Sequence, residues 1–302
     1  MKPTLGVIGL GIMGGAMAEA LLADGYRVVG YDVRAQPRQR LKKAGGRPLA
    51  SSAAVARSAA VLITSLATVA ALDDAVEKIA AARRSKSRPG LIVIETSTLP
   101  IADKVRALHT LQRAGIALLD CPISGTAVRM KQGAWTIFVS GSVAASKRVK
   151  PVLAVFTRNA PHVGAFGNGT KMKFIANHLV AIYNVAYGES LTFARKMGLD
   201  PRQVWDLFAE SPIIGNGVFK LRGKFMVDRK YLPATMKIEV WQKDMQVIGD
   251  MAKAVGCPTP LFSACAPIYT AAMAQGLSQH DTASVCEVLA AMAGGRRSRR
   301  QR

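Results

Sequence analysis

The sequence predicts a two-domain α/β protein, in which a sheet-containing half precedes an all-helical half. Short β-branched runs alternate with helical patterns up to about residue 166, and from Gly167 the strand pattern stops. One helical pattern, at residues 170–196, is long for a globular helix and is expected to join the two domains. The predicted parts are a sheet domain, a helical domain and a disordered basic tail, at residues 1–166, 167–293 and 294–302.

The composition is that of a globular protein with an excess of basic residues. Half of the 302 residues are hydrophobic and a fifth are charged, which is enough for two cores. The formal net charge is +22, carried partly by the tail and by a basic cluster at residues 83–88. No nucleic-acid-binding motif accompanies this charge. Nucleic acid is therefore not an expected partner, whereas a positive field would attract small anionic substrates.

The sequence predicts neither a membrane span nor a metal site. The apolar N-terminal run resembles a signal peptide, but five glycines interrupt it, and no apolar stretch is long enough to cross a bilayer. The four cysteines and four histidines are scattered, with no spacing typical of zinc ligands or of a disulfide framework. We therefore expect a soluble protein of the reducing cytoplasm that holds no metal.

A glycine motif follows the first predicted strand, at residues 5–8. It opens an amphipathic helix with Gly9, Leu10, Gly11, Ile12, Met13 and Gly14. Gly9 allows a tight turn, Gly11 lets the backbone approach a pyrophosphate, and Gly14 lets the helix pack closely on the strand. The helix N-terminus attracts the phosphate charge. This context predicts a Rossmann dinucleotide-binding domain in which these six residues contact the cofactor.

An acidic residue follows the second predicted strand, at residues 27–31. Asp32 lies 18 residues after Gly14, where a carboxylate binds the ribose hydroxyls of NAD and repels the 2′-phosphate of NADP. Arg34 and Arg38 follow it closely and could instead pair with that phosphate. NAD is therefore the predicted cofactor, and NADP stays open as the alternative.

Four further strands continue the sheet, at residues 60–63, 91–94, 116–119 and 135–140. Ligands of open parallel sheets bind beyond the carboxyl ends of the strands. Leu66 and Thr98, which follow two of these strands, are therefore predicted to contact the cofactor. Ser97 and Thr98 could equally be N-caps of the next helix, and this alternative stays open.

The second half contains five predicted helices, at residues 170–196, 201–210, 237–255, 259–275 and 281–293. Near the start of the first, Lys173 and Asn177 are one turn apart, so their side chains lie on one face. The positive end of the helix dipole disfavours an added positive charge there, which suits Lys173 to exchanging a proton near neutral pH. The competing interpretation is an ordinary solvated lysine.

Six short blocks stand in order along the chain: GLGIMG at residues 9–14, ETSTLP at 95–100, DCPISG at 120–125, GNGTKMKFIAN at 167–177, QKDM at 242–245 and GLSQHD at 276–281. Together they resemble the β-hydroxyacid dehydrogenase family, which includes 3-hydroxyisobutyrate dehydrogenase, tartronate semialdehyde reductase and glyoxylate/succinic semialdehyde reductase. The resemblance covers residues 4 to about 290. It implies an oxidoreductase that transfers a hydride between NAD(P) and a small 3-hydroxy acid or its semialdehyde.

The resemblance also implies roles for individual catalytic and substrate-binding residues. Lys173 matches the family's general acid/base, and Asn177 the asparagine that holds the substrate oxygen. Ser124 and Gly125 match the residues whose side chain and backbone N–H bind the substrate carboxylate. Lys173, Asn177 and Ser124 are thus the implied catalytic set.

Three further residues receive roles from the resemblance near the cofactor. Thr98 matches a residue between cofactor and substrate, and Lys243 matches a lysine that reaches toward the cofactor. The neighbouring Asp244 would orient Lys243 or cap its helix.

Departures from the family pattern concern the substrate more than the chemistry. Thr126 stands where a second glycine is usual, Met130 replaces an alanine, and Trp135 replaces a smaller aliphatic residue. Met236 stands at a substrate-lining position that is aromatic in some semialdehyde reductases. Thr126 and Met236 are thus expected substrate contacts, and the sequence leaves open whether the substrate is a 3-hydroxyisobutyrate-like acid or glyoxylate/succinic semialdehyde.

The principal alternative to an enzyme is a non-catalytic NAD(P)-binding protein on the same fold. The basic tail and the charge of +22 favour it, whereas the retention of Lys173, Asn177 and Ser124 argues against it. Imine reduction, found on a relative of this fold that lacks the lysine, is disfavoured for the same reason. Relatives associate through their helical domains, so a homodimer or homotetramer is expected.

Overall fold

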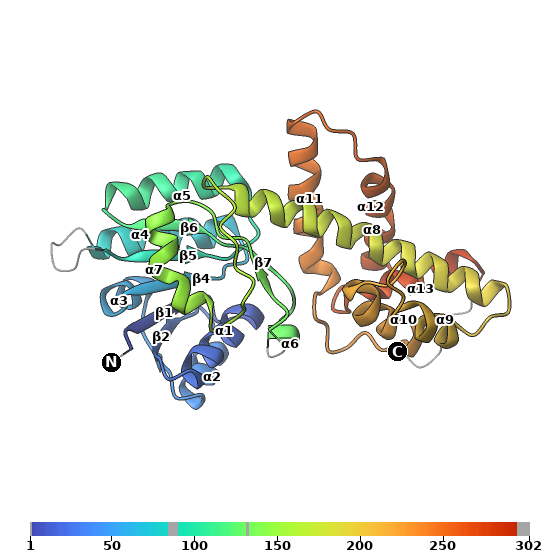
Figure 1. Cartoon of the computed structure of the whole chain (residues 1–302), viewed down its shortest axis with the longest axis horizontal. Helices are drawn as coiled ribbons and strands as arrows, with labels where there is room; N and C mark the ends of the chain where they lie inside the picture. The colour runs from blue at the N-terminus through green and yellow to red at the C-terminus, as the bar shows by residue number, and fades with distance from the viewer. Residues whose placement is uncertain (1, 84–89, 131–132, 295–302) are drawn as a thin grey trace. The chain divides into compact units, whose positions relative to one another are not determined.

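A computed structural model of the chain describes residues 2–83, 90–130 and 133–294. It forms two compact units, Met1–Lys173 and Phe174 onward (Figure 1). The first is an α/β unit and the second is helical, so the predicted fold class is confirmed. The predicted basic tail, from residue 295, and the basic cluster, from residue 84, lie outside the described residues.

The first unit is built on a six-stranded parallel sheet in the order β3-β2-β1-β4-β5-β6. Its strands are β1 (Thr4–Ile8), β2 (Arg27–Tyr31), β3 (Arg47–Pro48), β4 (Val61–Thr64), β5 (Ile92–Glu95) and β6 (Ala117–Asp120). The order reverses at β1, which pairs with both β2 and β4, so the carboxyl ends of β1 and β4 form the switch point where such sheets bind ligands.

The register brings the strand ends to one edge of the sheet. Ile8 is aligned with Tyr31 on one side and with Thr64 on the other. Thr64 is aligned with Glu95, and Glu95 with Asp120. Polar residues that are distant in sequence therefore meet at the expected cofactor edge.

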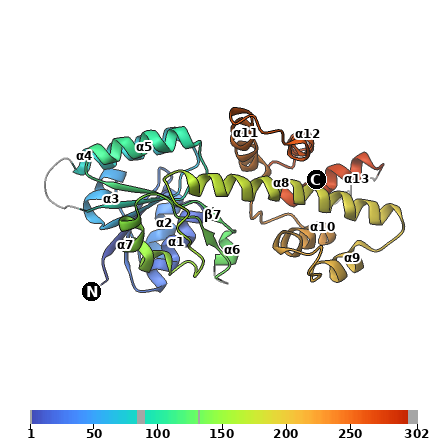
Figure 2. The ribbon, with the colours of Figure 1, turned by 45° about the horizontal axis from the view of Figure 1, so that its top comes forward.

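Helices cover both faces of the sheet, because successive strand residues point to opposite sides. Ile92 and Ile94 pack with α1 (Ile12–Ala23) and α7 (Val143–Leu153), whereas Val93 packs on the other face. Figure 2 shows α1 and α7 on one side of the sheet, and α4 (Val69–Arg83) and α5 (Ile101–Arg113) on the other. The first unit also contains α2 (Ala35–Lys43) and α3 (Ser52–Ser58).

The last predicted strand of this half is correct only in part. Within residues 135–140 only Thr136–Ile137 forms a strand, β8, which pairs antiparallel with β7 (Ile123–Ser124). Val139 and Ser140 make isolated bridges, to His162 and Asp120. The short helix α6 (Ala127–Met130) follows β7.

The second unit consists of helices, and the predicted ranges for four of them are confirmed within a few residues. They are α8 (Asn168–Lys196), whose first residues belong to the first unit, α9 (Pro201–Phe208), α11 (Ile238–Ala254) and α12 (Pro260–Ala274). The predicted helix at 281–293 is instead a 3₁₀ turn, Thr282–Ser284, followed by α13 (Val285–Met292). The π-helical turn Phe219–Gly223 and α10 (Lys224–Asp228) were not predicted, because segments this short carry too little periodicity.

None of the helices in these described ranges has the length and apolar character that crossing a bilayer requires.

A buried carboxylate organises the loop before α11. Asp281 accepts hydrogen bonds from the Thr235 N–H (2.8 Å) and hydroxyl (2.7 Å) and from the Met236 N–H (3.2 Å). It also accepts one from the Ala283 N–H (3.0 Å) and pairs with the Arg222 guanidinium (3.3 Å). Burial raises the pKa of Asp281, but Arg222 and these hydrogen bonds together outweigh burial, so the pKa lies below its ordinary value.

The Asp281→Asn variant is expected to be destabilised by about 1–3 kcal/mol at pH 7, because buried donors lose their charged acceptor. A depressed folded-state pKa contributes stability above the unfolded value of about 3.9, and this contribution is lost as pH falls through the folded pKa. The gap in unfolding free energy between wild type and variant should therefore shrink between pH 7 and pH 3. Chemical denaturation at both pH values measures it, with the exposed Asp250→Asn as control. A gap that stays constant contradicts this role.

Candidate active site

The glycine motif forms a tight turn between β1 and α1. Gly9 has a φ of +85°, a left-handed conformation that favours glycine, and its N–H donates to the Tyr31 carbonyl (2.9 Å). A Cβ at Gly9 would collide with the Ser65 carbonyl, and a Cβ at Gly14 with the Gly9 carbonyl. At Gly11 a Cβ would meet only the end of the flexible Arg34 side chain, an Nη at 3.8 Å, which is an ordinary van der Waals distance. Two glycines are thus required by the fold, whereas Gly11 is not.

The N-terminus of α1 fits a phosphate. Gly11 is the N-cap residue, so no side chain caps the helix, and the first turn carries no acidic residue. Ile12 is 58% exposed, Met13 is half-buried, and Leu10 is buried. First-turn N–H groups without a side-chain cap are suited to bind the pyrophosphate of a dinucleotide.

Asp32 is buried at the end of β2 and is bound to the glycine turn. One carboxylate oxygen accepts the Leu10 N–H (2.8 Å), and the other accepts the Arg34 N–H (2.9 Å). The Arg34 side chain pairs with Asp32 at 3.4 Å, and the Arg38 guanidinium donates to the Asp32 carbonyl (2.6 Å). The residue expected at the ribose therefore has one guanidinium group at its carboxylate and another at its backbone carbonyl.

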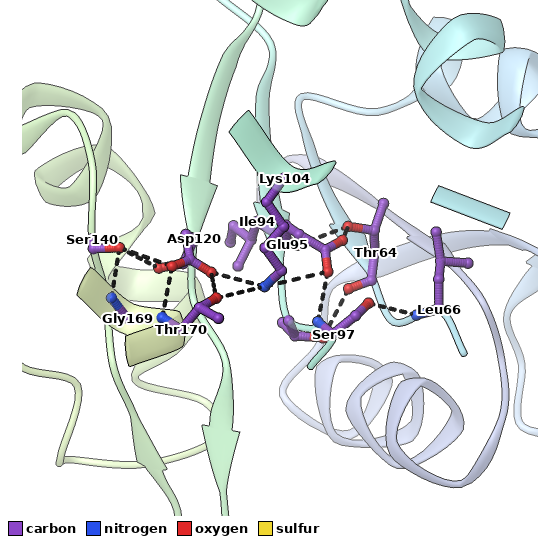
Figure 3. Close-up of polar contacts among 11 residues, drawn as sticks. Thr64, Leu66, Ile94, Glu95, Ser97, Lys104, Asp120, Ser140, Gly169 and Thr170 are labelled. Carbon is purple, nitrogen blue, oxygen red and sulfur yellow. Dashed lines mark hydrogen bonds and ion pairs between the residues drawn. The ribbon is translucent and has the colours of Figure 1, made fainter. Parts of the chain in front are cut away.

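The loops after β4 and β5 are joined by a side chain. The Ser97 hydroxyl accepts a hydrogen bond from the Leu66 N–H at 2.8 Å (Figure 3). The N-cap of α5 is Pro100, so the alternative that Ser97 or Thr98 caps this helix is wrong. Thr98 is half-buried immediately after Ser97. The structure thus brings the predicted cofactor residues Leu66 and Thr98 to the carboxyl edge of neighbouring strands.

The loop that is expected to bind the substrate carboxylate packs against an aromatic ring. Ser124 ends β7, and Gly125 has a φ of +137° with the Trp135 ring where a Cβ would lie. The Trp135 indole donates to the Thr126 carbonyl at 2.7 Å. The Thr126 hydroxyl is buried and has no hydrogen-bond partner within the described part of the chain. Trp135 thus fixes the backbone of this loop and leaves one buried hydroxyl to be paired.

Helix α8 carries Lys173 and Asn177 one turn apart. Their side chains are only 9% and 4% exposed, so the interpretation of Lys173 as a solvated surface lysine is wrong. The neighbouring Lys171 and Met172 are exposed. Because polar side chains at i and i+4 are usually exposed, the burial of both indicates that this face of α8 is not an ordinary solvated surface.

Asn177 is held by the lysine–aspartate pair of α11. Its amide nitrogen donates to one oxygen of Asp244 at 2.8 Å, and the Lys243 ammonium lies 2.9 Å from the other. Asp244 is buried in the middle of α11, so it does not cap that helix and instead orients both side chains. Met236 is half-buried, with its N–H bound to Asp281 and its carbonyl to Thr282.

One buried ionic cluster was missed by the sequence analysis. Lys104 is wholly buried between Glu95 and Asp120 (Figure 3). The available signal was helical phase, because Lys104 falls on the same face of α5 as the buried Ala107 and Leu111.

A Rossmann sheet whose first helix offers an uncapped N-terminus to a phosphate defines the class of protein, one that binds a dinucleotide. Comparisons with known proteins agree. Residues 4–164 match the NAD-binding domain of 6-phosphogluconate dehydrogenase, and residues 167–289 match the NAD-binding domain of NADP-dependent 3-hydroxyisobutyrate dehydrogenase.

Relatives match over nearly the full length of the chain. An L-threonate dehydrogenase of Cupriavidus necator is 30% identical, covering 95% of this chain and 96% of the relative. The chloroplastic glyoxylate/succinic semialdehyde reductase 2 of Arabidopsis thaliana is 26% identical over 95% of this chain and 80% of its own. The crystal structure of a 3-hydroxyisobutyrate dehydrogenase from Salmonella typhimurium matches with a TM-score of 0.84 at 27% identity, covering 94% and 99% of the two chains.

The chain belongs to the β-hydroxyacid dehydrogenase family. It is accordingly an NAD(P)-dependent oxidoreductase that acts on CH–OH groups.

Proposed function

We propose that the substrate is a small 3-hydroxy acid or its semialdehyde and that Lys173 is the general acid/base. The observation that carries this proposal is the buried Asn177 on α8, one turn from the buried Lys173 and oriented by Asp244. Two buried polar groups of this kind are suited to a hydroxyl oxygen, one holding it and the other exchanging its proton.

The proposed chemistry divides between the cofactor and the chain. NAD(P), when bound, accepts a hydride from the substrate carbon or returns it. In oxidation the neutral amine of Lys173 takes the hydroxyl proton, and in reduction its ammonium gives a proton to the developing alkoxide. Asn177 holds that oxygen, and the Ser124 hydroxyl and Gly125 N–H bind the carboxylate, which selects the carbon that reacts.

The loop around Thr126 supports a choice among the candidate substrates. The buried Thr126 hydroxyl, which has no partner among the described residues, favours a substrate with a further polar group, since an unsatisfied buried hydroxyl is costly. L-Threonate offers such a group, and a relative 30% identical to this chain carries that substrate in its name. We therefore place L-threonate first among the candidate acids, with 3-hydroxyisobutyrate next. Thr126 and Met236 are the proposed substrate-lining positions that distinguish them.

The test is the absorbance of reduced nicotinamide with purified protein, using NAD and NADP separately. L-Threonate, 3-hydroxyisobutyrate, 3-hydroxypropionate and glycerate are tested for oxidation, and glyoxylate and succinic semialdehyde for reduction. Turnover of a hydroxy acid supports the proposal, and turnover of glyoxylate or succinic semialdehyde alone supports the reductase alternative. Tight cofactor binding without turnover of any compound would instead support a non-catalytic NAD(P)-binding protein.

We propose NAD as the preferred cofactor, with Asp32 as the discriminating residue. The Asp32→Asn variant keeps an acceptor for the Leu10 N–H but removes the charge that opposes Arg34 and Arg38. The ratio of kcat/KM for NADP to that for NAD should rise about tenfold, because two guanidinium groups become available to a 2′-phosphate. Steady-state kinetics with both cofactors measures the ratio. Adding Arg34→Gln should reverse the gain, and an unchanged ratio in Asp32→Asn would remove Asp32 from this role.

We also propose that the chain works as a homodimer or homotetramer in the cytoplasm. Several large apolar side chains of α8 are exposed, among them Ile175, Leu179 and Phe193, and such groups favour association. Sedimentation equilibrium of the purified protein gives the oligomer size, and a monomer at micromolar concentration would contradict the proposal.

A further inference from the structure

A lysine is buried where a surface helix meets the sheet. Lys104 lies on α5 and is 0% exposed. Burying an ammonium is costly unless charges and hydrogen bonds compensate it, so a fully buried lysine has a specific set of partners. A buried ion pair is in itself weak evidence for stability, because an apolar residue of similar size often serves as well. Its geometry is therefore the informative feature.

Three groups surround the Lys104 ammonium. Its Nζ lies 2.8 Å from an Asp120 carboxylate oxygen and 3.1 Å from the Thr170 hydroxyl. A Glu95 carboxylate oxygen lies 3.8 Å away, an ion pair without a direct hydrogen bond. Figure 3 shows Lys104 between Asp120 and Thr170 on one side and Glu95 on the other. Both carboxylates are fully buried, so the three side chains carry a formal charge of −1 in the interior.

On one side the cluster binds the first turn of α8. Asp120 accepts both the Thr170 N–H (2.8 Å) and the Thr170 hydroxyl (2.7 Å). The Ser140 hydroxyl accepts the Gly169 N–H (3.0 Å) and donates to Asp120 (3.2 Å). These contacts satisfy N–H groups that a helix start leaves unpaired, and negative charge is stabilising at that end of the helix. Lys173 follows Thr170 by three residues on this helix.

On the other side the cluster binds the loops after β4 and β5. Glu95 accepts the Ser97 N–H at 2.7 Å with one carboxylate oxygen and the Thr64 hydroxyl with the other. Ser97 in turn accepts the Leu66 N–H at 2.8 Å. The Lys104 ammonium therefore pairs with Glu95 on the cofactor side and donates to Thr170 at the start of α8 (Figure 3).

We propose that Lys104 is a positioning residue for the reaction. It holds the cofactor-binding loops and the first turn of α8 in one rigid arrangement, so that the place of Lys173 is set relative to the cofactor. This inference rests on the proposed role of Lys173. Its magnitude follows from the sensitivity of catalysis to geometry, because a displacement of about 1 Å can lower a rate about 100-fold.

The first test uses variants that keep every charge of the cluster. Thr170→Val removes the hydroxyl that contacts Lys104 and Asp120, and Thr170→Ser retains it. Thr192→Val is the matched control, because Thr192 is also buried on α8 and its hydroxyl donates to the Gly188 carbonyl, away from the cluster. Ser97→Ala breaks the opposite arm, at the Leu66 N–H.

Hydrogen–deuterium exchange measures the coupling between the loops after β4 and β5 and the start of α8 without requiring turnover. Thr170→Val should raise amide exchange at residues 64–68 and 96–98 as well as at the start of α8, and Ser97→Ala should raise exchange at residues 169–173. Lys104→Met should raise exchange at both. Thr170→Ser and Thr192→Val should leave residues 64–68 and 96–98 unchanged. Exchange that rises only in the segment carrying the substitution, in both Thr170→Val and Ser97→Ala, would overturn the proposal even if Lys104→Met fails to fold.

Cofactor binding and turnover complete the test. Thr170→Val should raise the dissociation constant of NADH severalfold, measured by fluorescence, and lower kcat about tenfold on the acid that the wild type turns over, with recovery in Thr170→Ser. In the double variant Thr170→Val/Ser97→Ala, the fold-loss in kcat should be smaller than the product of the fold-losses in the two single variants, since both side chains belong to one cluster. Multiplicative losses would overturn the proposal. If Lys173→Ala stayed active, the proposed function would fail, whereas the exchange and NADH results would still decide whether the cluster couples the two segments.

Discussion

The Lys173→Ala variant is expected to lose nearly all turnover, with kcat falling about 10²- to 10⁴-fold, the range typical of general acid–base catalysis. Lys173 is buried on α8, whereas the neighbouring Lys171 is exposed. The dissociation constant of NADH should change by less than about twofold, because the proposed role concerns the substrate proton. The measurements are single-turnover kinetics and NADH fluorescence titration. A large loss of kcat with an unchanged NADH dissociation constant distinguishes a role of Lys173 in proton transfer from a role in stabilising the fold.

The chain provides a matched control on the same helix. Lys171 is two residues from Lys173 but is exposed, with its ammonium 3.4 Å from the Asn168 side chain. Lys171→Ala should retain kcat within about twofold, as expected for an exposed surface position. If Lys171→Ala and Lys173→Ala lost activity equally, a general effect of charge on this helix would explain both, and the specific role of Lys173 would be lost. Activity of Lys173→Ala close to that of wild type would also contradict it.

Local patterns predicted most of the fold. The strand Arg27–Tyr31 was predicted with its exact bounds, and α8 was predicted to within two residues at its start, because a short apolar run marks the strand and a long apolar helical pattern marks the helix. The glycine motif is likewise local: strand, turn and helix are consecutive, and each glycine is required or permitted by neighbours nearby in the chain.

The contacts that hold the candidate site were beyond such patterns. Lys104 pairs with Asp120, 16 residues away, and with Thr170, 66 residues away. Asn177 meets Asp244 across 67 residues. Nothing in either local sequence specifies these pairings, which arise from strand register and helix packing. The two roles that the sequence left open for Asp244, orienting a lysine or capping a helix, could therefore be separated only by its position within α11.

The variants Gly11→Ala and Gly14→Ala are expected to fail in different ways. At Gly11 the new methyl group would meet only the end of the flexible Arg34 side chain, and the backbone φ of −64° is ordinary, so stability should be unchanged. The methyl group nevertheless occupies the side from which a pyrophosphate approaches α1, so the dissociation constant of NADH should rise at least about tenfold. At Gly14 the methyl group collides with the Gly9 carbonyl, so unfolding free energy should fall by about 1–3 kcal/mol or more.

Thermal unfolding and NADH titration on the same preparations distinguish these outcomes. Gly249→Ala is the control, because Gly249 lies within α11 with nothing near its Cβ position, and alanine there should add about 0.5–1 kcal/mol of stability without affecting NADH. Unchanged NADH affinity in a stable Gly11→Ala would mean that the phosphates do not approach the chain at this residue. Because the uncapped N-terminus of α1 is the feature that fits a pyrophosphate, the binding site would then have to be sought away from the glycine turn.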